Sequence, residues 1–314
     1  MRNTLNTGLT FDNQTMPLKG VMYALGAVMI WTGFILVSKA GALAALAMPD
    51  MIMVRFGTAF ILFSPFIWRH RKTIFQWRMG VLGAIGGLAY AVSVFNGFAQ
   101  APATHAALLL PGLMPIMIAV FAYFVAGERH NASSWIGIIV SSLGIAALLI
   151  ETLTSDGRYW QGDVSFVVAC VFWGIFTVLL RRWKFAPWHA TLGIITVTTL
   201  LFTPIYMLFL PHHIMDVPLQ MVGLQAFYQG VMATTIQMVF YGRAVHLIGA
   251  TKMGGLMALV PVFASVIAVP LFGEQWTIGL TIALAFILTG TLISNLPVMS
   301  WLGLARRKQL CSAS

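Results

Sequence analysis

The chain contains 314 residues, of which 59% are hydrophobic and only 8% are charged. A soluble globular domain carries about a quarter charged residues, because water must wet its surface. This composition excludes a soluble enzyme, a nucleic-acid-binding protein and a secreted disulfide-stabilised domain, and it places the chain in a lipid bilayer. The net charge of +10 is then interpreted from the distribution of Lys and Arg between loops.

Apolar segments bounded by charged residues, proline or glycine follow one another along almost the whole chain. About 20 apolar residues cross a bilayer as one helix, so the segments predict ten transmembrane helices in an all-α polytopic membrane protein. The connectors between them are short, which leaves little room for a separate soluble domain. We expect the helices at residues 20–39, 50–68, 79–98, 104–126, 134–150, 163–180, 188–210, 220–241, 253–272 and 277–297.

Polar segments flank the predicted helices. Residues 1–19 are expected to form a cytoplasmic tail, and the basic residues 298–314 a second one. The two cysteines, Cys170 and Cys311, lie far apart and form neither a disulfide framework nor a metal site. We therefore expect no metal and no cofactor.

The basic residues also predict the orientation of the chain in the membrane. Loops rich in Lys and Arg stay on the cytoplasmic side during insertion. With the first tail inside, all of the 18 Lys and Arg residues except Lys39, Arg55 and Arg158 fall in cytoplasmic segments. Both termini are therefore predicted to be cytoplasmic.

The two halves of the chain resemble each other at an offset of about 139 to 147 residues. The matches keep the same order through four of five predicted helices, which indicates duplication of a five-helix unit. We expect the units at residues 20–150 and 163–297, joined by a periplasmic linker at 151–162. The matched pairs are Trp31 with Trp173, Phe63-Ser64-Pro65 with Phe202-Thr203-Pro204, Gly97 with Gly242, Ala103-Thr104 with Ala250-Thr251, Pro115 with Pro261, and Gly127-Glu128 with Gly273-Glu274.

The odd number of helices in each unit has a topological consequence. The second unit must enter the membrane from the opposite side, so the two repeats are predicted to be inverted. Inverted repeats can exchange conformations and expose a central site first to one face and then to the other. This pattern indicates a carrier that works by alternating access.

Two five-helix halves, with Trp31 and Trp173 in their first helices, Pro115 and Pro261 in their fourth, and Gly-Glu after the fourth, resemble the EamA family of the drug/metabolite transporter superfamily. Similar proteins are bacterial inner-membrane exporters of amino acids, other metabolites or drugs, and the superfamily includes sugar-phosphate and nucleotide-sugar carriers. The resemblance implies a ten-helix fold around a central cavity. It also implies a lining mainly from the third, fourth, eighth and ninth helices, with help from the first and sixth.

Polar and aromatic side chains inside the predicted spans are the candidates for substrate contact. Polar groups in hydrocarbon face either a wet cavity or a partner helix, so interhelical hydrogen bonding is the alternative interpretation. The third and eighth predicted helices each carry a polar stripe, and both tryptophans of the repeat lie in mid-span. The predicted substrate-binding residues are Trp31, Tyr90, Asn96, Gln100, His105, Trp173, Tyr228, Gln229, Gln237 and Tyr241.

Prolines in the fourth and ninth predicted helices remove backbone donors and favour kinks. We predict that they act as hinges or gates, with static curvature as the alternative. These residues are Pro111, Pro115, Pro261 and Pro270. Glu128 and Glu274 end equivalent helices, where we expect a helix-boundary role.

Lys39 and Arg55 lie near the outer ends of their predicted helices. We favour snorkelling to the headgroups or pairing with Asp50 for both side chains, although a carrier of anions would use such residues.

The leading hypothesis is a secondary transporter in the bacterial inner membrane that exports small metabolites, most readily amino acids including aromatic ones. Gln, Asn, Tyr and Trp without a buried carboxylate suit zwitterions that bind through hydrogen bonds and stacking. A sugar-phosphate or nucleotide-sugar antiporter, with Lys39, Arg55 and Lys252 on the phosphate, is the alternative in the same superfamily. A non-transporting scaffold is the alternative from another class. An enzyme is not expected, because the chain lacks a phosphate loop, a zinc-protease motif and an intramembrane aspartate pair.

Overall fold

The computed structural model describes residues 17–127, 132–154 and 158–295, and all regular structure within these ranges is helical. Most of the two predicted tails, together with Glu128, lies outside the described residues. Among those residues, six helical segments are long and apolar enough to cross a membrane. They are α1 (Leu18–Leu43), α2 (Met48–Arg69), the continuous run of α4 (Trp77–Gly83), η1 (Ala84–Ala89) and α5 (Tyr90–Gln100), α6 (Ala103–Ala126), α8 (Trp160–Arg182) and α9 (Pro187–Phe209).

The other four predicted spans fall on helices that are shorter in their apolar part or interrupted. Short connecting helices, α3 (Arg71–Ile74) and η2 (Ile214–Asp216), lie between longer ones. The remaining helices are α7 (Ala132–Thr154), α10 (Leu219–Gln225) followed by η3 (Ala226–Ile236) and α11 (Gln237–Ile248), α12 (Ala250–Met257), α13 (Leu259–Phe272) and α14 (Ile278–Asn295).

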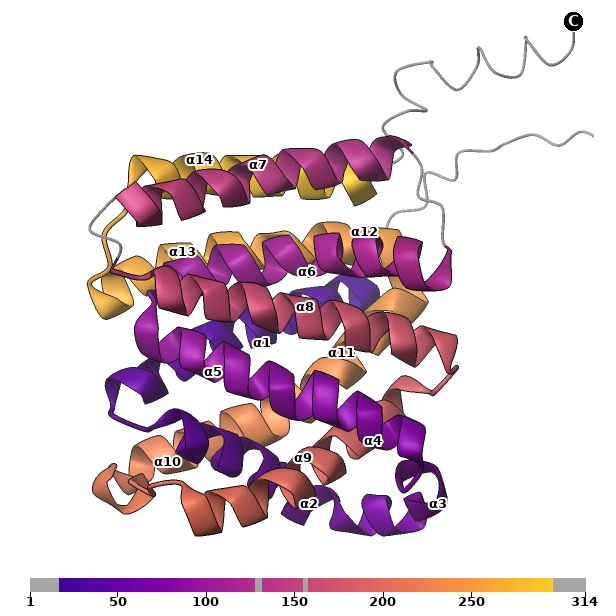
Figure 1. Cartoon of the computed structure of the whole chain (residues 1–314). Helices are drawn as coiled ribbons and strands as arrows, with labels where there is room; N and C mark the ends of the chain where they lie inside the picture. Colours follow the sequence, from indigo (N-terminus) through magenta and orange to yellow (C-terminus); the bar gives the residue numbers. More distant parts are fainter. Residues whose placement is uncertain (1–16, 128–131, 155–157, 296–314) are drawn as a thin grey trace, which may run out of the picture.

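The helices form one bundle in which the two halves of the chain pack against each other (Figure 1). Helices α7 and α14 pair along one side, and α2 and α9 pair on the opposite side. Between them, α6 packs on α8 and α1 packs on α13, while α1 also packs on α11 and α5 on α8. The sequence repeat relates the contact of α6 with α8 to that of α13 with α1. It likewise relates the contact of α1 with α11 to that of α8 with α5.

Helices α1 and α8, the first helices of the two repeats, run in opposite directions. Near the end of α1, the Lys39 ammonium donates a hydrogen bond to the Ala101 carbonyl at 2.7 Å. At the start of α8, a Cβ atom on Gly162 would lie 2.8 Å from the Ala101 amide nitrogen. The end of α1 and the start of α8 therefore meet the same junction between α5 and α6.

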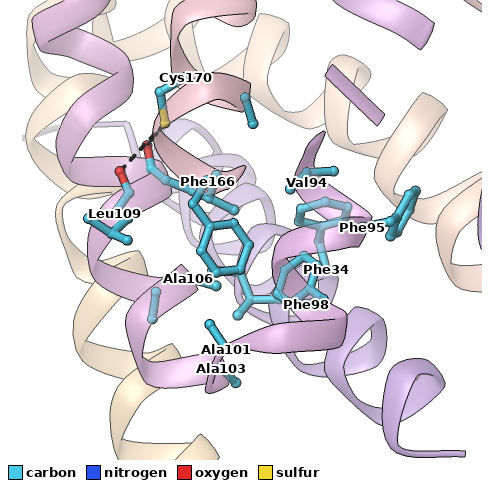
Figure 2. Packing of buried hydrophobic residues seen from close by; sticks show 14 of the residues in the cluster. Phe34, Val94, Phe95, Phe98, Ala101, Ala103, Ala106, Leu109, Phe166 and Cys170 are labelled. Carbon is cyan, nitrogen blue, oxygen red and sulfur yellow. Dashed lines mark hydrogen bonds between the residues drawn. The ribbon is translucent and has the colours of Figure 1, made fainter. Parts of the chain in front are cut away.

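Aromatic side chains fill the space between α1, α5 and α8. The Phe98 ring lies edge-on to Phe34 at 6.0 Å and to Phe166 at 5.2 Å between centroids. Gly97 admits the Phe166 ring, since a Cβ atom there would lie 2.5 Å from it. Nearby, the Cys170 thiol of α8 donates to the Leu109 carbonyl of α6 at 3.7 Å (Figure 2). Because lipid is as apolar as these rings, van der Waals packing holds the helices together.

Two π-helical segments occupy related positions in the two halves. η1 begins at Ala84 and η3 at Ala226, which agrees with the offset of the sequence repeat. In η3, the Thr234 hydroxyl donates to the carbonyl of Gln229, five residues earlier, at 2.6 Å. π-helical turns are rare and are frequent at functional sites. The sequence analysis predicted ordinary helices here.

Prolines have different effects in the related helices α6 and α13. Helix α6 continues through both Pro111 and Pro115. In the second half, α12 ends at Met257, and α13 begins at Leu259 after a turn at Ala258. The Pro261 ring conflicts with the carbonyl four residues earlier, at Met257, the last residue of α12, and so contributes to the break.

Candidate functional site

A cavity of about 720 Å³ lies at the end of the bundle where α1, α5 and α13 end and α6 and α14 begin. Its lining contains two cations, Lys39 and Arg158, and two carboxylates, Glu151 and Glu274. The formal charges of these four groups cancel. The predicted residues Gln100 and His105 also line the cavity.

Lys39 joins the end of α1 to the end of α5. Its ammonium donates to the carbonyls of Phe98 at 3.2 Å and Ala101 at 2.7 Å. The last carbonyls of a helix lack partners within the helix, and a cation is favourable there. The expected pairing with Asp50 is wrong, because the Asp50 carboxylate accepts from the Tyr206 hydroxyl at 2.5 Å and the His213 amide at 3.2 Å.

Glu274 caps the start of α6. Its two carboxylate oxygens accept from the backbone amides of Ala103 at 2.6 Å and Thr104 at 2.9 Å. These amides belong to the first helical residues, whose donors have no partner within the helix. Gly273 has φ of 66°, and this left-handed conformation ends α13 just before the carboxylate. Glu274 follows the end of α13, as expected for a residue at a helix boundary, and it also caps the start of α6.

His105 and Asp163 join the first turns of α6 and α8. The Nδ1 atom of His105 lies 2.9 Å from Oδ1 of Asp163, and the side chains are 14% and 1% exposed. The Tyr159 ring lies edge-on to the imidazole at 5.6 Å. Sequence reasoning missed this pair, because two residues 58 positions apart give no local signal of contact.

A second polar cluster lies between α1, α2 and η3. The Gln229 amide donates to the Ser38 hydroxyl at 2.8 Å. The same amide accepts from the Arg55 guanidinium at 3.3 Å. The Ser38 hydroxyl donates to the Phe34 carbonyl at 2.6 Å. The amide of the predicted residue Gln229 therefore takes part in contacts that hold three helices together.

Trp31, the tryptophan of the first repeat, takes part in a similar contact nearer the start of α1. In the amide orientation that satisfies both of its polar atoms, Gln237 donates to the Ala27 carbonyl at 3.0 Å and accepts from the Trp31 indole at 2.6 Å. The Tyr228 hydroxyl donates to the Ile30 carbonyl at 3.3 Å. The polar stripe of η3 and α11 thus faces α1.

The remaining predicted residues lie apart from these groups. The rings of Tyr90 and Trp173 pack together at 5.1 Å between α5 and α8. The Asn96 amide donates to the Ser165 hydroxyl at 2.9 Å, and Tyr241 is 42% exposed on α11. Among the described residues, those of η3 and α11 do not line the cavity. The cavity therefore differs from the lining that the family resemblance implied, and the lining by α7, α14 and the segment at 158–159 was missed.

The two ends of α1 have different surroundings. At the end of α1, Ala99 is exposed and lines the cavity together with Lys39. Near the start of α1, Ala24 packs in a buried cluster with Ala244, Ile248 and Met253, and Ala244 is 0% exposed. The bundle is therefore hollow beside the end of α1 and packed beside its start.

Known proteins resemble the chain in sequence. An uncharacterized transporter from Clostridium kluyveri is 23% identical over 188 residues, or 55% of this chain and 58% of the relative. The aromatic amino acid exporter YddG from Ancylobacter novellus is 27% identical over 138 residues, or 43% and 48%. The inner membrane protein YtfF from Escherichia coli is 26% identical over 184 residues, or 53% and 56%. The chain spans about half of the length of these relatives.

A solved structure and a family model also match the chain. A solved crystal structure superposes with a TM-score of 0.58 at 21% identity, covering 88% of this chain and 96% of the other, which shows a shared fold. The model of the EamA-like transporter family matches residues 18–150 and again residues 160–296. The two matches confirm the repeat seen in the sequence. The chain therefore belongs to the EamA-like transporter family, as a multi-pass membrane protein.

Proposed function

We propose that the protein is a secondary transporter that exports small metabolites, most readily amino acids including aromatic ones, by alternating access. The observation that carries this proposal is the difference between the end of α1, where Ala99 is exposed at a polar cavity, and the start of α1, where Ala244 is buried in a packed cluster. A carrier with two exchanging halves is open at one end and closed at the other in any one state. A scaffold needs no such difference.

The charges of the cavity favour a zwitterionic substrate. Lys39 and Arg158 balance Glu151 and Glu274, so the lining has no net formal charge from these groups and does not repel a molecule that carries both a carboxylate and an ammonium. A phosphate dianion would meet two carboxylates in the same space, which disfavours an organophosphate or nucleotide-sugar substrate. The side chain of Lys252, proposed for phosphate, lies outside the described part of the chain. One relative is named as an aromatic amino acid exporter, which agrees with the proposal.

We propose further that the shorter and interrupted helices complete ten membrane crossings in two inverted units, 20–150 and 163–297. The opposite directions of α1 and α8 support this arrangement. With both termini in the cytoplasm of a bacterium, the cavity at the end of α1 faces the periplasm. A substrate entering between Gln100 and His105 would approach the polar groups along α1, and the break before Pro261 is the proposed hinge.

Counterflow in proteoliposomes tests the proposed activity. Vesicles loaded with unlabelled L-phenylalanine should accumulate labelled L-phenylalanine, and Ala99→Trp should block this accumulation by filling the cavity. Val239→Trp, at a 48% exposed position of α11 away from the cavity, serves as the matched control. Accumulation no greater than in empty liposomes, across all twenty amino acids, would contradict the proposal.

A further inference from the structure

Arg55 is a charged side chain that the described residues do not neutralise. It lies seven residues after the start of α2, which is about 10 Å of helix rise. Its guanidinium donates a hydrogen bond to a neutral amide, from Nη1 to Oε1 of Gln229 at 3.3 Å. Its Nε atom is buried and has no hydrogen-bond partner. A guanidinium has five N–H donors, so most of its capacity is unused.

The nearby acid is already engaged. Asp50, five residues earlier on α2, accepts from the Tyr206 hydroxyl and from the His213 amide. Among the described residues, no carboxylate forms an ion pair with Arg55. The guanidinium instead lies over two aromatic rings, Phe34 at 5.2 Å and Phe56 at 5.4 Å from the centroids. Aromatic faces attract a cation without supplying a hydrogen-bond acceptor.

A partly buried cation without a counter-ion destabilises a protein, and an intramembrane charge faces a partner or a pathway. Arg remains charged in proteins, so loss of a proton does not relieve this cost. The planar guanidinium is suited to a carboxylate, which it binds through two parallel hydrogen bonds. The group that would complete the site is therefore a planar anion such as a carboxylate, bound beside the two aromatic rings.

We infer that Arg55 binds the carboxylate of the transported molecule, whose aromatic part packs against the rings beside Arg55. The inference rests on the proposed function and identifies the group that it recognises. Gln229 and Ser38 hold the guanidinium in place from η3 and α1. Arg55 therefore joins the substrate to the interface between the first helix of one repeat and the third helix of the other.

Thermal unfolding of the purified full chain with defined probes tests this inference. We expect 3-phenylpropionate and L-phenylalanine to raise the melting temperature, whereas phenethylamine, which lacks the carboxylate, leaves it unchanged. Arg55→Gln should weaken 3-phenylpropionate binding by about 30-fold or more, since a buried charge pair is lost. Arg55→Lys, which keeps the charge but loses the planar geometry, should show an intermediate loss.

The control is Arg78→Gln, an exposed arginine over Trp77 at 5.4 Å, which should bind the probes as the wild type does. Without ligand, Arg55→Gln should melt no lower than the wild type, because a partly buried charge without a counter-ion is removed. Equal binding of phenethylamine and 3-phenylpropionate to the wild type would overturn the inference, as would no binding of either carboxylate. A large loss of ligand-free stability in Arg55→Gln, or stabilisation by inorganic phosphate alone, would also overturn it.

The same variant separates this inference from the proposed function. If Arg55→Gln exchanges L-phenylalanine as well as the wild type does, amino-acid export stands and the role of Arg55 is wrong. If 3-phenylpropionate binds through Arg55 but no amino acid is exchanged, the role of Arg55 stands and the proposed substrate is wrong.

Discussion

At the scale of single residues, charged side chains at the cavity compensate for the ends of helices. Lys39 satisfies the last carbonyls of α5, and Glu274 satisfies the first amides of α6. Both contacts match the sign of the helix dipole that they face. Lys39 and Glu274 therefore stabilise the helix ends that form the cavity wall, in addition to lining the cavity. Arg55 differs from them, because it donates to the side-chain amide of Gln229 and not to the end of a helix.

For the pair of His105 and Asp163, we predict which of two substitutions destabilises the protein more. His105→Leu leaves a buried carboxylate without its partner, and it should destabilise the protein by about 3 kcal/mol or more. Asp163→Asn leaves an imidazole that can stay neutral, so the loss should be nearer to about 1 kcal/mol. Thermal unfolding in detergent measures both.

Asp216→Asn is the control for this pair. Asp216 lies 3.2 Å from the His213 ring, but that pair is exposed, at 55% and 77%, and its removal should change little. An equal effect of His105→Leu and Asp163→Asn would show that the buried carboxylate has other partners and would refute the predicted order.

At the scale of elements, small residues bring helices into backbone contact. A Cβ atom on Gly290 of α14 would lie 2.5 Å from the Gly137 carbonyl of α7 and 2.5 Å from the Ser141 amide. These neighbours are backbone atoms, which cannot rotate away as a side chain can. Helices in lipid depend on such close packing, so the α7–α14 pair should be sensitive to one methyl group.

Gly290→Ala should therefore lower the free energy of unfolding, by about 1 to 3 kcal/mol. Gly242→Ala is the matched control, because a Cβ atom there meets nothing within 4 Å, and replacing a helical Gly by Ala is favourable. Chemical or thermal unfolding of both variants measures the difference. Equal stability of Gly290→Ala and wild type would mean that α14 shifts freely on α7.

The break between α12 and α13 gives a kinetic prediction. Pro261→Ala restores a backbone donor and removes the ring conflict, so the two helices should join and hinge motion should slow. We expect counterflow to slow by about fivefold, or about 1 kcal/mol of barrier, with substrate affinity unchanged. Pro204→Ala is the control, because α9 continues through its proline. An unchanged exchange rate in Pro261→Ala would assign the break to static curvature.

At the scale of the whole molecule, the sequence predicted what depends on composition and local order. Apolar periodicity placed the helices, and matches such as Trp31 with Trp173 revealed the repeat that the family comparison confirms. Contacts between distant residues were not predictable in this way. His105 with Asp163, and Lys39 with the carbonyl of Ala101, depend on how helices meet in space. The same limit applies to Arg55, because its hydrogen bond to Gln229, 174 positions away, gives no signal in the sequence.

The number of membrane crossings, ten, and the hinge role of the prolines are predictions. Helix α13 and the apolar part of α7 are shorter than the six clear spans. The related positions of η1 and η3 show that the repeat extends to irregular backbone that composition cannot reveal.

Labelling of single cysteines from each side of the membrane tests alternating access most directly. In a background without Cys170 and Cys311, Ala99→Cys should react with a membrane-impermeant maleimide from the periplasmic side, and Ala244→Cys should be protected. Conditions that drive exchange should reverse this pattern, so that Ala244→Cys reacts from the cytoplasmic side as Ala99→Cys becomes protected. If Ala99→Cys stays reactive and Ala244→Cys stays protected under every condition, the two halves do not exchange roles and the carrier mechanism is contradicted.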